Sequence, residues 1–374
     1  MSIATHTAAI TGLTNVCMAQ VAPITAITNV RVFDGQKICP PSTVIINGEF
    51  IGSLDMIPTE TLDAQGGILL PGLIDSHIHL TGRDDLSQLA EYGITTGFDM
   101  ATWPIELLDS LREEKGVTDI LGSGIPATSP GSAHSKIPTM PKEALVANAS
   151  EAKKFVDDRV AEGADYIKVV ADVPGPDQET INALVSNAHL NQKLVVVHAI
   201  NVIATQMAQI AGADVITHAP LDGVMSDAEV HQMVKDNRIS IPTLVMMNVT
   251  AISKGLDFEN ACKTVVALHR SGVPVLAGTD ANSAPGVPAQ VSHGISLHEE
   301  LELLVRCGMS TTEALRAATS VPAKHFGLCD RGVIQPGYRA DLVLVGGNPI
   351  ENITATKSIQ KVWIAGQEFK RSQV

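Results

Sequence analysis

The fold is decided by GLIDSHIHL (residues 72–80), a short apolar run that ends in two histidines. It is the first of eight such runs, and Ala-, Glu- and Leu-rich stretches of helical composition separate them. The other runs are GITTGFDM (93–100), DILGSGI (119–125), DYIKVVA (165–171), KLVVVHA (193–199), DVITHA (214–219), ISIPTLV (239–245) and PVLAGTD (274–280). Between them, residues 143–162 carry apolar side chains at three- and four-residue spacing, which predicts a helix. Eight strand–helix units predict an α/β fold closed into a (β/α)8 TIM barrel.

Strand patterning also occurs near both ends of the chain. Residues 25–34 and 43–53 are predicted as strands joined by a loop with Pro40 and Pro41, whereas residues 297–327 are predicted as helices. Strand patterns return in GVIQPGYRADLVLVGGNP (332–349) and SIQKVWIAGQEF (358–369). We therefore expect three parts: an N-terminal extension (1–24), a small β-sandwich domain from residues 25–67 and 330–374, and a metal-dependent barrel over residues 68–329.

The composition excludes several classes of protein. Of the 374 residues, 45% are hydrophobic and 18% are charged, which argues against a disordered chain. No uninterrupted apolar run approaches the roughly 20 residues that a membrane-spanning helix needs. With 26 Lys and Arg against 40 Asp and Glu, the net charge of −14 repels nucleic acid and anionic membranes. We expect neither as a partner.

The cysteines and the first residues bear on the cellular compartment. The five cysteines are scattered, odd in number and never in C-x-x-C spacing, which fits a reducing compartment better than a disulfide scaffold. Residues 1–24 are apolar like a signal peptide, but they lack its basic start and are interrupted by Thr, Asn and Gln. The sequence thus favours a cytoplasmic protein over a secreted one.

Several titratable residues occupy the carboxyl ends of predicted strands, where barrel enzymes place their active sites. The first strand ends in His77 and His79, which share a face because side chains alternate with period two. The fifth and sixth strands end in His198 and His218, and the eighth ends in Asp280. Each alone has an ordinary explanation, such as chance, a core histidine or a turn cap. Together, neutral imidazoles and a carboxylate at one rim predict a site for a cation such as Zn²⁺.

Lys168 lies inside the fourth predicted strand, in YIKVVAD. A strand buried on both faces leaves no water for an ammonium group, and burying that charge unpaired is costly. The side chain should therefore lose its proton or be modified. A neutral lysine can add carbon dioxide and become a carbamate, a carboxylate-like group that can bridge two metal ions.

Seven motifs, in this order, resemble the amidohydrolase superfamily, and within it the imidazolonepropionase-like branch of prolidase-type peptidases and ochratoxinase-like amidases. They are LLPGLIDSHIHL (69–80), DYIKVVAD (165–172), VVVHA (195–199), THA (217–219), AGTDAN (277–282), HGISLHEELELLV (293–305) and GVIQPGYRADLVLV (332–345). The resemblance covers about residues 25–370 and implies a (β/α)8 barrel beside a small β-sandwich.

The resemblance also implies a binuclear metal centre, usually of zinc. The more buried ion would be held by His77, His79 and Asp280, the other by His198 and His218, and carboxylated Lys168 would bridge them. Two cations that share a hydroxide supply a nucleophile near neutral pH and polarise the scissile carbonyl. Asp280 would then accept the proton of the hydroxide and deliver it to the leaving nitrogen.

Two more histidines are candidates for contact with substrate. His134 lies in the Gly- and Ser-rich loop after the third strand, where related enzymes place a histidine that touches the scissile carbonyl. His293 follows the eighth strand and could meet a substrate carboxylate. For both, a histidine without a functional role is the alternative. Aromatic residues make up only 3% of the chain, so we expect aliphatic contacts and a few polar groups to hold the substrate.

The leading interpretation is a metal-dependent hydrolase of a small-molecule carboxamide, such as an N-acyl amino acid or a dipeptide. The alternative is a mononuclear deaminase or a cyclic-amide or carbamate hydrolase of the same superfamily. Lys168 argues against a mononuclear enzyme, because imidazolonepropionases and many deaminases lack the lysine of the fourth strand. A catalytically dead assembly protein is the third interpretation, but such relatives usually lose metal ligands, which this chain keeps. Because relatives commonly self-associate, we expect a homo-oligomer.

Overall fold

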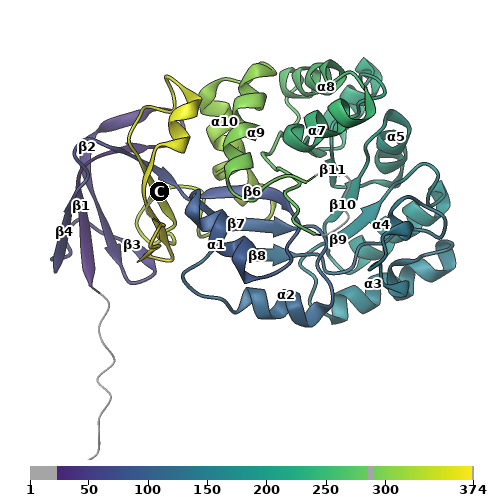
Figure 1. The fold of residues 1–374 in the computed structure, drawn as a ribbon, viewed down its shortest axis with the longest axis horizontal. Coiled ribbons are helices and arrows are strands. Elements are labelled where there is room, and N and C mark those ends of the chain that lie inside the picture. The colour runs from purple at the N-terminus through teal and green to yellow at the C-terminus, as the bar shows by residue number, and fades with distance from the viewer. Residues whose placement is uncertain (1–22, 285–289, 373–374) are drawn as a thin grey trace, which may run out of the picture.

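A computed structural model describes residues 23–284 and 290–372 of the chain (Figure 1). Parallel strands that alternate with helices form the middle of the chain, and a separate sheet unites strands from its two ends. The chain therefore has an α/β fold, as expected. Of the predicted N-terminal extension over residues 1–24, residues 1–22 lie outside the described part of the chain.

Seven of the eight predicted runs contain a regular parallel strand. These strands are β6 (Leu73–Ile78), β7 (Ile94–Asp99), β8 (Asp119–Gly122), β9 (Ile167–Val170), β10 (Val195–His198), β11 (Val215–Thr217) and β12 (Ile239–Ile241). They form two sheets, one in the order β6-β7-β8 and the other in the order β9-β10-β11-β12. Almost every residue in them is buried, because apolar side chains are covered on both faces of each sheet.

The eighth run is the exception, since residues 274–280 form no regular strand. Three isolated parallel bridges connect the sheet edges and this run: Ser240 with Val275, Ile78 with Ala281, and Ala127 with Val169. Among the described residues, the ladders thus do not form one continuous closed sheet. At the end of this run Asp280 has a positive φ of 59°, which lies outside the range of a strand.

Helices surround the parallel strands (Figure 1). They are α1 (Arg83–Glu91), α2 (Ile105–Arg112), α3 (Ala149–Ala161), α4 (Gln178–Leu190), α5 (Val202–Ala211), α6 (Asp227–Lys235), α7 (Leu244–Lys254), α8 (Glu259–Arg270), α9 (Ile295–Arg306), α10 (Thr311–Ala317) and α11 (Ser320–His325). The helical prediction for residues 297–327 is confirmed by α9, α10 and α11. The helix predicted from residue 143 begins later, because the Asn148 side chain caps α3 by accepting from the Ser150 amide. Residues 244–245, predicted as strand, already belong to α7.

The strands at the two ends of the chain pair into one eight-stranded sheet, in which the purple and yellow strands of Figure 1 lie side by side. They are β1 (Ile24–Phe33), β2 (Ile38–Asn47), β3 (Phe50–Gly52), β4 (Glu60–Asp63), β5 (Ile68–Pro71), β13 (Leu342–Val345), β14 (Ile359–Ile364) and β15 (Gln367–Glu368). Because β5 pairs with β1 and β13, the parallel strands begin at Leu73 rather than at the predicted boundary of residue 68.

Pro40 and Pro41 lie within β2, although a loop was predicted there. A proline has no N–H for the ladder, so it is tolerated in a strand only at an edge or an irregularity. Both conditions hold, because β3 pairs only with residues 45–47 of β2 and the register with β1 shifts beside the prolines.

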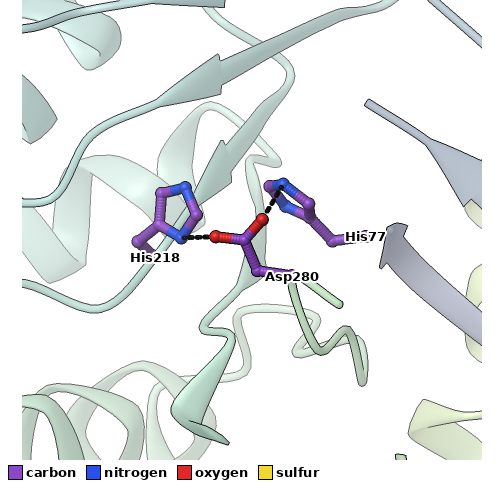
Figure 2. A group of neighbouring side chains, drawn as sticks. All are labelled: His77, His218 and Asp280. Atoms are coloured by element: carbon purple, nitrogen blue, oxygen red, sulfur yellow. Dashed lines mark ion pairs between the residues drawn. The ribbon is translucent and has the colours of Figure 1, made fainter. Parts of the chain in front are cut away.

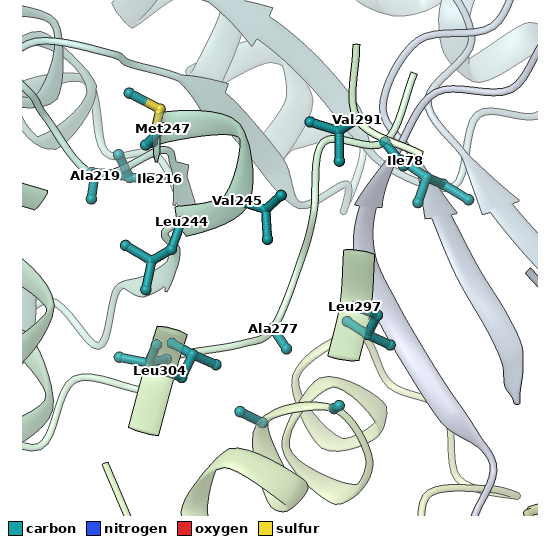
Figure 3. Packing of buried hydrophobic residues seen from close by; sticks show 14 of the residues in the cluster. Ile78, Ile216, Ala219, Leu244, Val245, Met247, Ala277, Val291, Leu297 and Leu304 are labelled. Carbon is teal, nitrogen blue, oxygen red and sulfur yellow. The ribbon is translucent and has the colours of Figure 1, made fainter. Parts of the chain in front are cut away.

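Several parallel strands, such as β10, bury alternating side chains in two different clusters. Val195 and Val197 of β10 face the main core between strands and helices, part of which Figure 3 shows, whereas Val196 faces a second cluster. That second cluster collects side chains from several strands and from the eighth run: Ile74, Phe98, Val196, Val215, Ile239 and Leu276. The sheets are therefore packed on both faces.

Cys262 of α8 and Cys307, directly after α9, form a disulfide, although the scattered cysteines were expected to fit a reducing compartment better than a disulfide scaffold. A separation of 45 residues carries no spacing signal. None of the helices in the described part of the chain combines the length and the apolarity that a bilayer-spanning helix requires.

Candidate metal centre

The carboxyl ends of the parallel strands bring three of the predicted histidines around Asp280. Figure 2 shows His77 of β6 and His218, which follows β11, on either side of the Asp280 carboxylate. Oδ1 of Asp280 lies 3.4 Å from Nε2 of His77 and 2.9 Å from Nε2 of His79. Oδ2 lies 3.9 Å from Nδ1 of His218. These residues are separated by up to 203 positions in the sequence, yet the fold brings the three imidazoles to the Asp280 carboxylate.

The backbone before Asp280 is held tightly against β6. The Asp280 amide donates to the His77 carbonyl at 2.8 Å. A Cβ atom on Gly278 would lie 3.0 Å from the His77 backbone nitrogen, so a side chain there would push the two segments apart. On the other side, buried Asp75 accepts hydrogen bonds from the Thr279 amide (3.1 Å) and hydroxyl (2.7 Å). This packing supports the positive φ of Asp280, a conformation of the kind that clusters at functional sites.

Burial keeps the imidazoles neutral. It lowers the pKa of His77 and His198 well below the ordinary value, and the charge of Lys168 lowers both further. The pKa of His218 falls to about 3, because burial outweighs the attraction of Asp280. For Asp280 itself, burial raises the pKa, but the pKa is lowered overall, and the hydrogen bond with His79 is the largest of the effects that lower it. Neutral imidazoles beside an ionised carboxylate are the protonation states that metal binding requires.

Lys168 lies in β9 with only 3% of its surface exposed. Its Nζ atom has one hydrogen bond, to Oγ1 of Thr217 at 3.4 Å. Burial lowers the pKa of Lys168 to about 7, although the charges of Asp280 and Asp99 raise it. This agrees with the expectation that the side chain loses its proton. Its carboxylation stays a prediction.

A second group of donors consists of His134, Asp172 and His198. Oδ2 of Asp172 accepts from the backbone nitrogen of His134 at 3.0 Å and lies 2.8 Å from its Nδ1. Oδ1 of Asp172 lies 4.0 Å from Nε2 of His198. Asp172 was not a predicted site residue. The available signal was its position four residues after Lys168, because period-two alternation puts both on one face of an extended strand.

The donor atoms of these residues fit divalent metal ions. Within each of two groups they lie within 4.8 Å of one another: His77, His218 and Asp280 form one, and His134, Asp172 and His198 form the other. Nε2 of His198 and Nε2 of His218 are buried and have no hydrogen-bond partner. Buried polar atoms are normally paired, so an unpaired imidazole nitrogen is what a coordinating cation would satisfy. The grouping differs from the predicted one, in which His198 and His218 shared an ion.

His293 lies behind the metal centre. Its side chain is 1% exposed, and Nε2 donates to the His79 carbonyl at 2.9 Å. Nδ1 of His293 lies 3.4 Å from the Asp85 carboxylate. This geometry favours support of the His79 backbone over direct contact with a substrate. His134 is more accessible, with 29% of its side chain exposed.

Comparison with known proteins identifies the family of this chain. The model of the amidohydrolase family matches residues 68–369. Ochratoxinase from Aspergillus niger is 24% identical to this chain over an alignment of 418 positions. The alignment covers 90% of this chain and 84% of that protein. Adenine deaminase from Nitratidesulfovibrio vulgaris is 26% identical over 369 residues, 94% of this chain but only 58% of the deaminase. This chain thus spans less than two thirds of that relative.

A solved structure shows the same fold. The crystal structure of a Xaa-Pro dipeptidase with bound methionine superposes with a TM-score of 0.80 at 23% identity, covering 93% of this chain and all of that one. The family match includes every strand and helix that carries a candidate metal ligand. The chain therefore belongs to the amidohydrolase family.

Proposed function

We propose that the chain is a metal-dependent hydrolase that cleaves the carboxamide C–N bond of a small molecule, such as an N-acyl amino acid or a dipeptide. The observation that carries the proposal is the meeting of buried, neutral imidazoles, a buried lysine and Asp280 at one edge of the parallel strands. Similarity to ochratoxinase and to a Xaa-Pro dipeptidase supports an amide or peptide substrate.

The proposed cofactor is a pair of divalent ions, with zinc as the first choice because imidazole and carboxylate suit it. One ion would be held by His77, His79 and Asp280. The other would lie between His198 and His218, whose ring centroids are 4.4 Å apart, although His218 also lies in the donor group of Asp280. Lys168 would bridge them as a carbamate. With a pKa of about 7, much of this lysine is a neutral amine near pH 7. Its nitrogen would form a bond to the carbon of carbon dioxide and release a proton, which yields the carbamate.

The proposed mechanism assigns proton transfer to Asp280. Divalent ions at this site would lower the pKa of a water molecule and polarise the substrate carbonyl. Asp280 would accept the proton of the attacking water and deliver it to the leaving nitrogen, a role that its lowered pKa permits. His134, whose Nδ1 is held by Asp172, would present its other ring nitrogen to the scissile carbonyl.

A mononuclear deaminase is the second candidate, favoured by the similarity to adenine deaminase. Lys168 discriminates between the two, because a single ion needs no bridging group. Burying a lysine with a single hydrogen bond at 3.4 Å costs folding free energy. A role for Lys168 as the bridging group explains why it is buried there, which supports the binuclear hydrolase.

We also propose that the two parallel sheets belong to one (β/α)8 barrel beside a small β-sandwich. The three bridges at the sheet edges support closure, and so does the second cluster, because strands of both sheets and the eighth run all contribute side chains to it. Self-association of the chain and a cytoplasmic location stay predictions.

A hydrolysis panel tests the function. Zinc-loaded protein is incubated with dipeptides, N-acyl amino acids, lactams, carbamates and aminated heterocycles, and products are identified by mass spectrometry. We expect cleavage of linear amides that is lost in Lys168→Ala but kept in Lys263→Ala, a matched exposed lysine of α8. Ammonia release from heterocycles, or activity that survives loss of Lys168, would instead support the mononuclear enzyme.

A further inference from the structure

Glu300 is a fully buried carboxylate on α9, the helix that carries Leu297 and Leu304 of Figure 3. Leu297, Leu301 and Leu304 lie on the same buried face at three- and four-residue spacing. Burial raises the pKa of Glu300 to about 8, with a smaller contribution from the charge of Asp75, whereas hydrogen bonds from the backbone N–H groups of Leu244 and Val245 lower it. A buried carboxylate in such surroundings is costly unless strong hydrogen-bond donors satisfy it.

The donors are the first two backbone N–H groups of α7. Leu244 N donates to Oε1 of Glu300 at 2.9 Å, and Val245 N donates to Oε2 at 2.8 Å. The first N–H groups of a helix have no partner within the helix, and the helix dipole attracts an anion there. Glu300 therefore caps α7 from a different helix.

The residue at the N-cap position of α7 is Thr243, but its side chain does not cap the helix. Threonine at this position ordinarily accepts a hydrogen bond from an amide in the first turn. Here the Thr243 hydroxyl lies 2.8 Å from Nδ1 of His218 instead. Thr243 also has a left-handed backbone conformation (φ 45°, ψ 51°), which is unfavourable for a β-branched residue and must be held by its surroundings.

We propose that Glu300 is a positioning residue of the metal centre, which caps α7 in place of Thr243 and thereby leaves the Thr243 hydroxyl to orient His218. His218 then carries its proton on Nδ1, donates a hydrogen bond to Oγ1 of Thr243 and keeps the unprotonated Nε2 free to bind a metal ion. The buried Nε2 without a hydrogen-bond partner agrees with this orientation. The inference rests on the proposed metal-dependent function, in which His218 is a ligand.

The experiment compares five single variants, and the double variant Glu300→Gln/Thr243→Val, with the wild-type protein. Glu300→Gln replaces one acceptor oxygen by an NH₂ group that faces a backbone N–H, and the milder Glu300→Asp keeps the carboxyl group. Thr243→Val removes only the hydroxyl, whereas Thr243→Ser keeps it. Glu299→Gln, at the exposed neighbouring position of α9, is the matched control. Two properties are measured on metal-free protein: the tautomer of His218, by ¹⁵N-histidine NMR, and zinc affinity, by competition with a chromophoric chelator.

We expect the Nδ1–H tautomer of His218 in the wild-type protein and in the variants Thr243→Ser and Glu299→Gln. Glu300→Gln and Thr243→Val should lose this tautomer and bind one zinc ion about 10- to 100-fold more weakly, as is typical when a group that orients a ligand is removed. Their effects should not add in the double variant, because both act through the same histidine. Glu300→Asp should have a smaller effect in the same direction.

Three results would overturn the inference. One is an Nε2–H tautomer in the wild-type protein. Another is zinc affinity within twofold of wild type in folded Glu300→Gln or Glu300→Asp together with an unchanged tautomer, which would make Glu300 a purely structural cap. The third is full additivity of the two substitutions. A wild-type protein that binds no zinc would instead refute the proposed function, while the tautomer measurement would still test the link from Glu300 to His218.

Discussion

Replacing Lys168 with methionine should stabilise the metal-free protein while it abolishes hydrolysis. Methionine is unbranched and apolar, so it can fill the space of the lysine stem without a charge. Burial lowers the pKa of Lys168 from 10.5 to about 7. The folded state therefore binds fewer protons than the unfolded state between these values, and stability rises with pH across that window. At 1.36 kcal/mol per pKa unit, the buried lysine costs about 4 kcal/mol at pH 7 and about 2 kcal/mol at pH 9.

The assay is urea unfolding of the metal-free protein at pH 7 and pH 9, with Lys263→Met as the control for loss of an exposed lysine. Lys168→Met should be more stable than wild type by about 4 kcal/mol at pH 7, and this advantage should halve at pH 9. Zinc should then raise the stability of the wild-type protein more than that of the variant. A variant that is less stable at pH 7, or an advantage that is unchanged at pH 9, would refute the argument that the ammonium is buried at a cost.

Three further predictions concern the metal centre and its surroundings. Asp280→Asn should keep most of its zinc but lose turnover by about 10²- to 10⁴-fold, which metal analysis and kcat measure; full turnover would exclude its role as proton carrier. Gly278→Ala should lower both zinc affinity and stability, the latter by about 1–3 kcal/mol, because the new Cβ would lie 2.5 Å from Cγ2 of Ile241. Chemical denaturation measures the loss of stability. An unchanged free energy of unfolding would mean that the backbone around residue 278 shifts at little cost. Burial lowers the pKa of His298 to about 4, so the wild-type protein should lose about 3 kcal/mol as the pH falls from 6.5 to 4, a loss that His298→Gln lacks. If the difference in the free energy of unfolding between the wild-type protein and His298→Gln were the same at pH 7 and pH 4.5, the lowered pKa of His298 would be contradicted.

The parallel strands were predictable because each is short, apolar and separated from the next by a stretch of helical composition. The regular strands β6 to β12 lie inside the runs predicted for them. The eighth run was predicted as a strand on its apolar residues alone. Its backbone departs from a strand at Asp280, because contact of Gly278 with β6 and the hydrogen bonds of Asp75 hold the segment in another conformation.

The candidate ligands were predictable for a chemical reason. Histidine, lysine and aspartate at the carboxyl ends of apolar runs are costly to bury, so their presence there already indicates a functional role. Asp172, Glu300 and Thr243 were harder to find, because each acts through one neighbour that is distant in the sequence. Nothing in HEELELLV distinguishes Glu300 from the exposed Glu299 or the half-buried Glu302 until the helix is packed against α7.

The donor groups of this protein and the order in which they follow the strands can be read from the chain alone, because residue type and local periodicity are properties of the chain. Which donors meet depends on the tertiary structure. His77 and Asp280 are 203 positions apart, and their contact depends on how the eighth run closes against β6. The same packing pairs Cys262 with Cys307 and directs Glu300 to the first turn of α7. Distances between such groups depend on the simultaneous packing of many elements, which no local pattern of residues encodes.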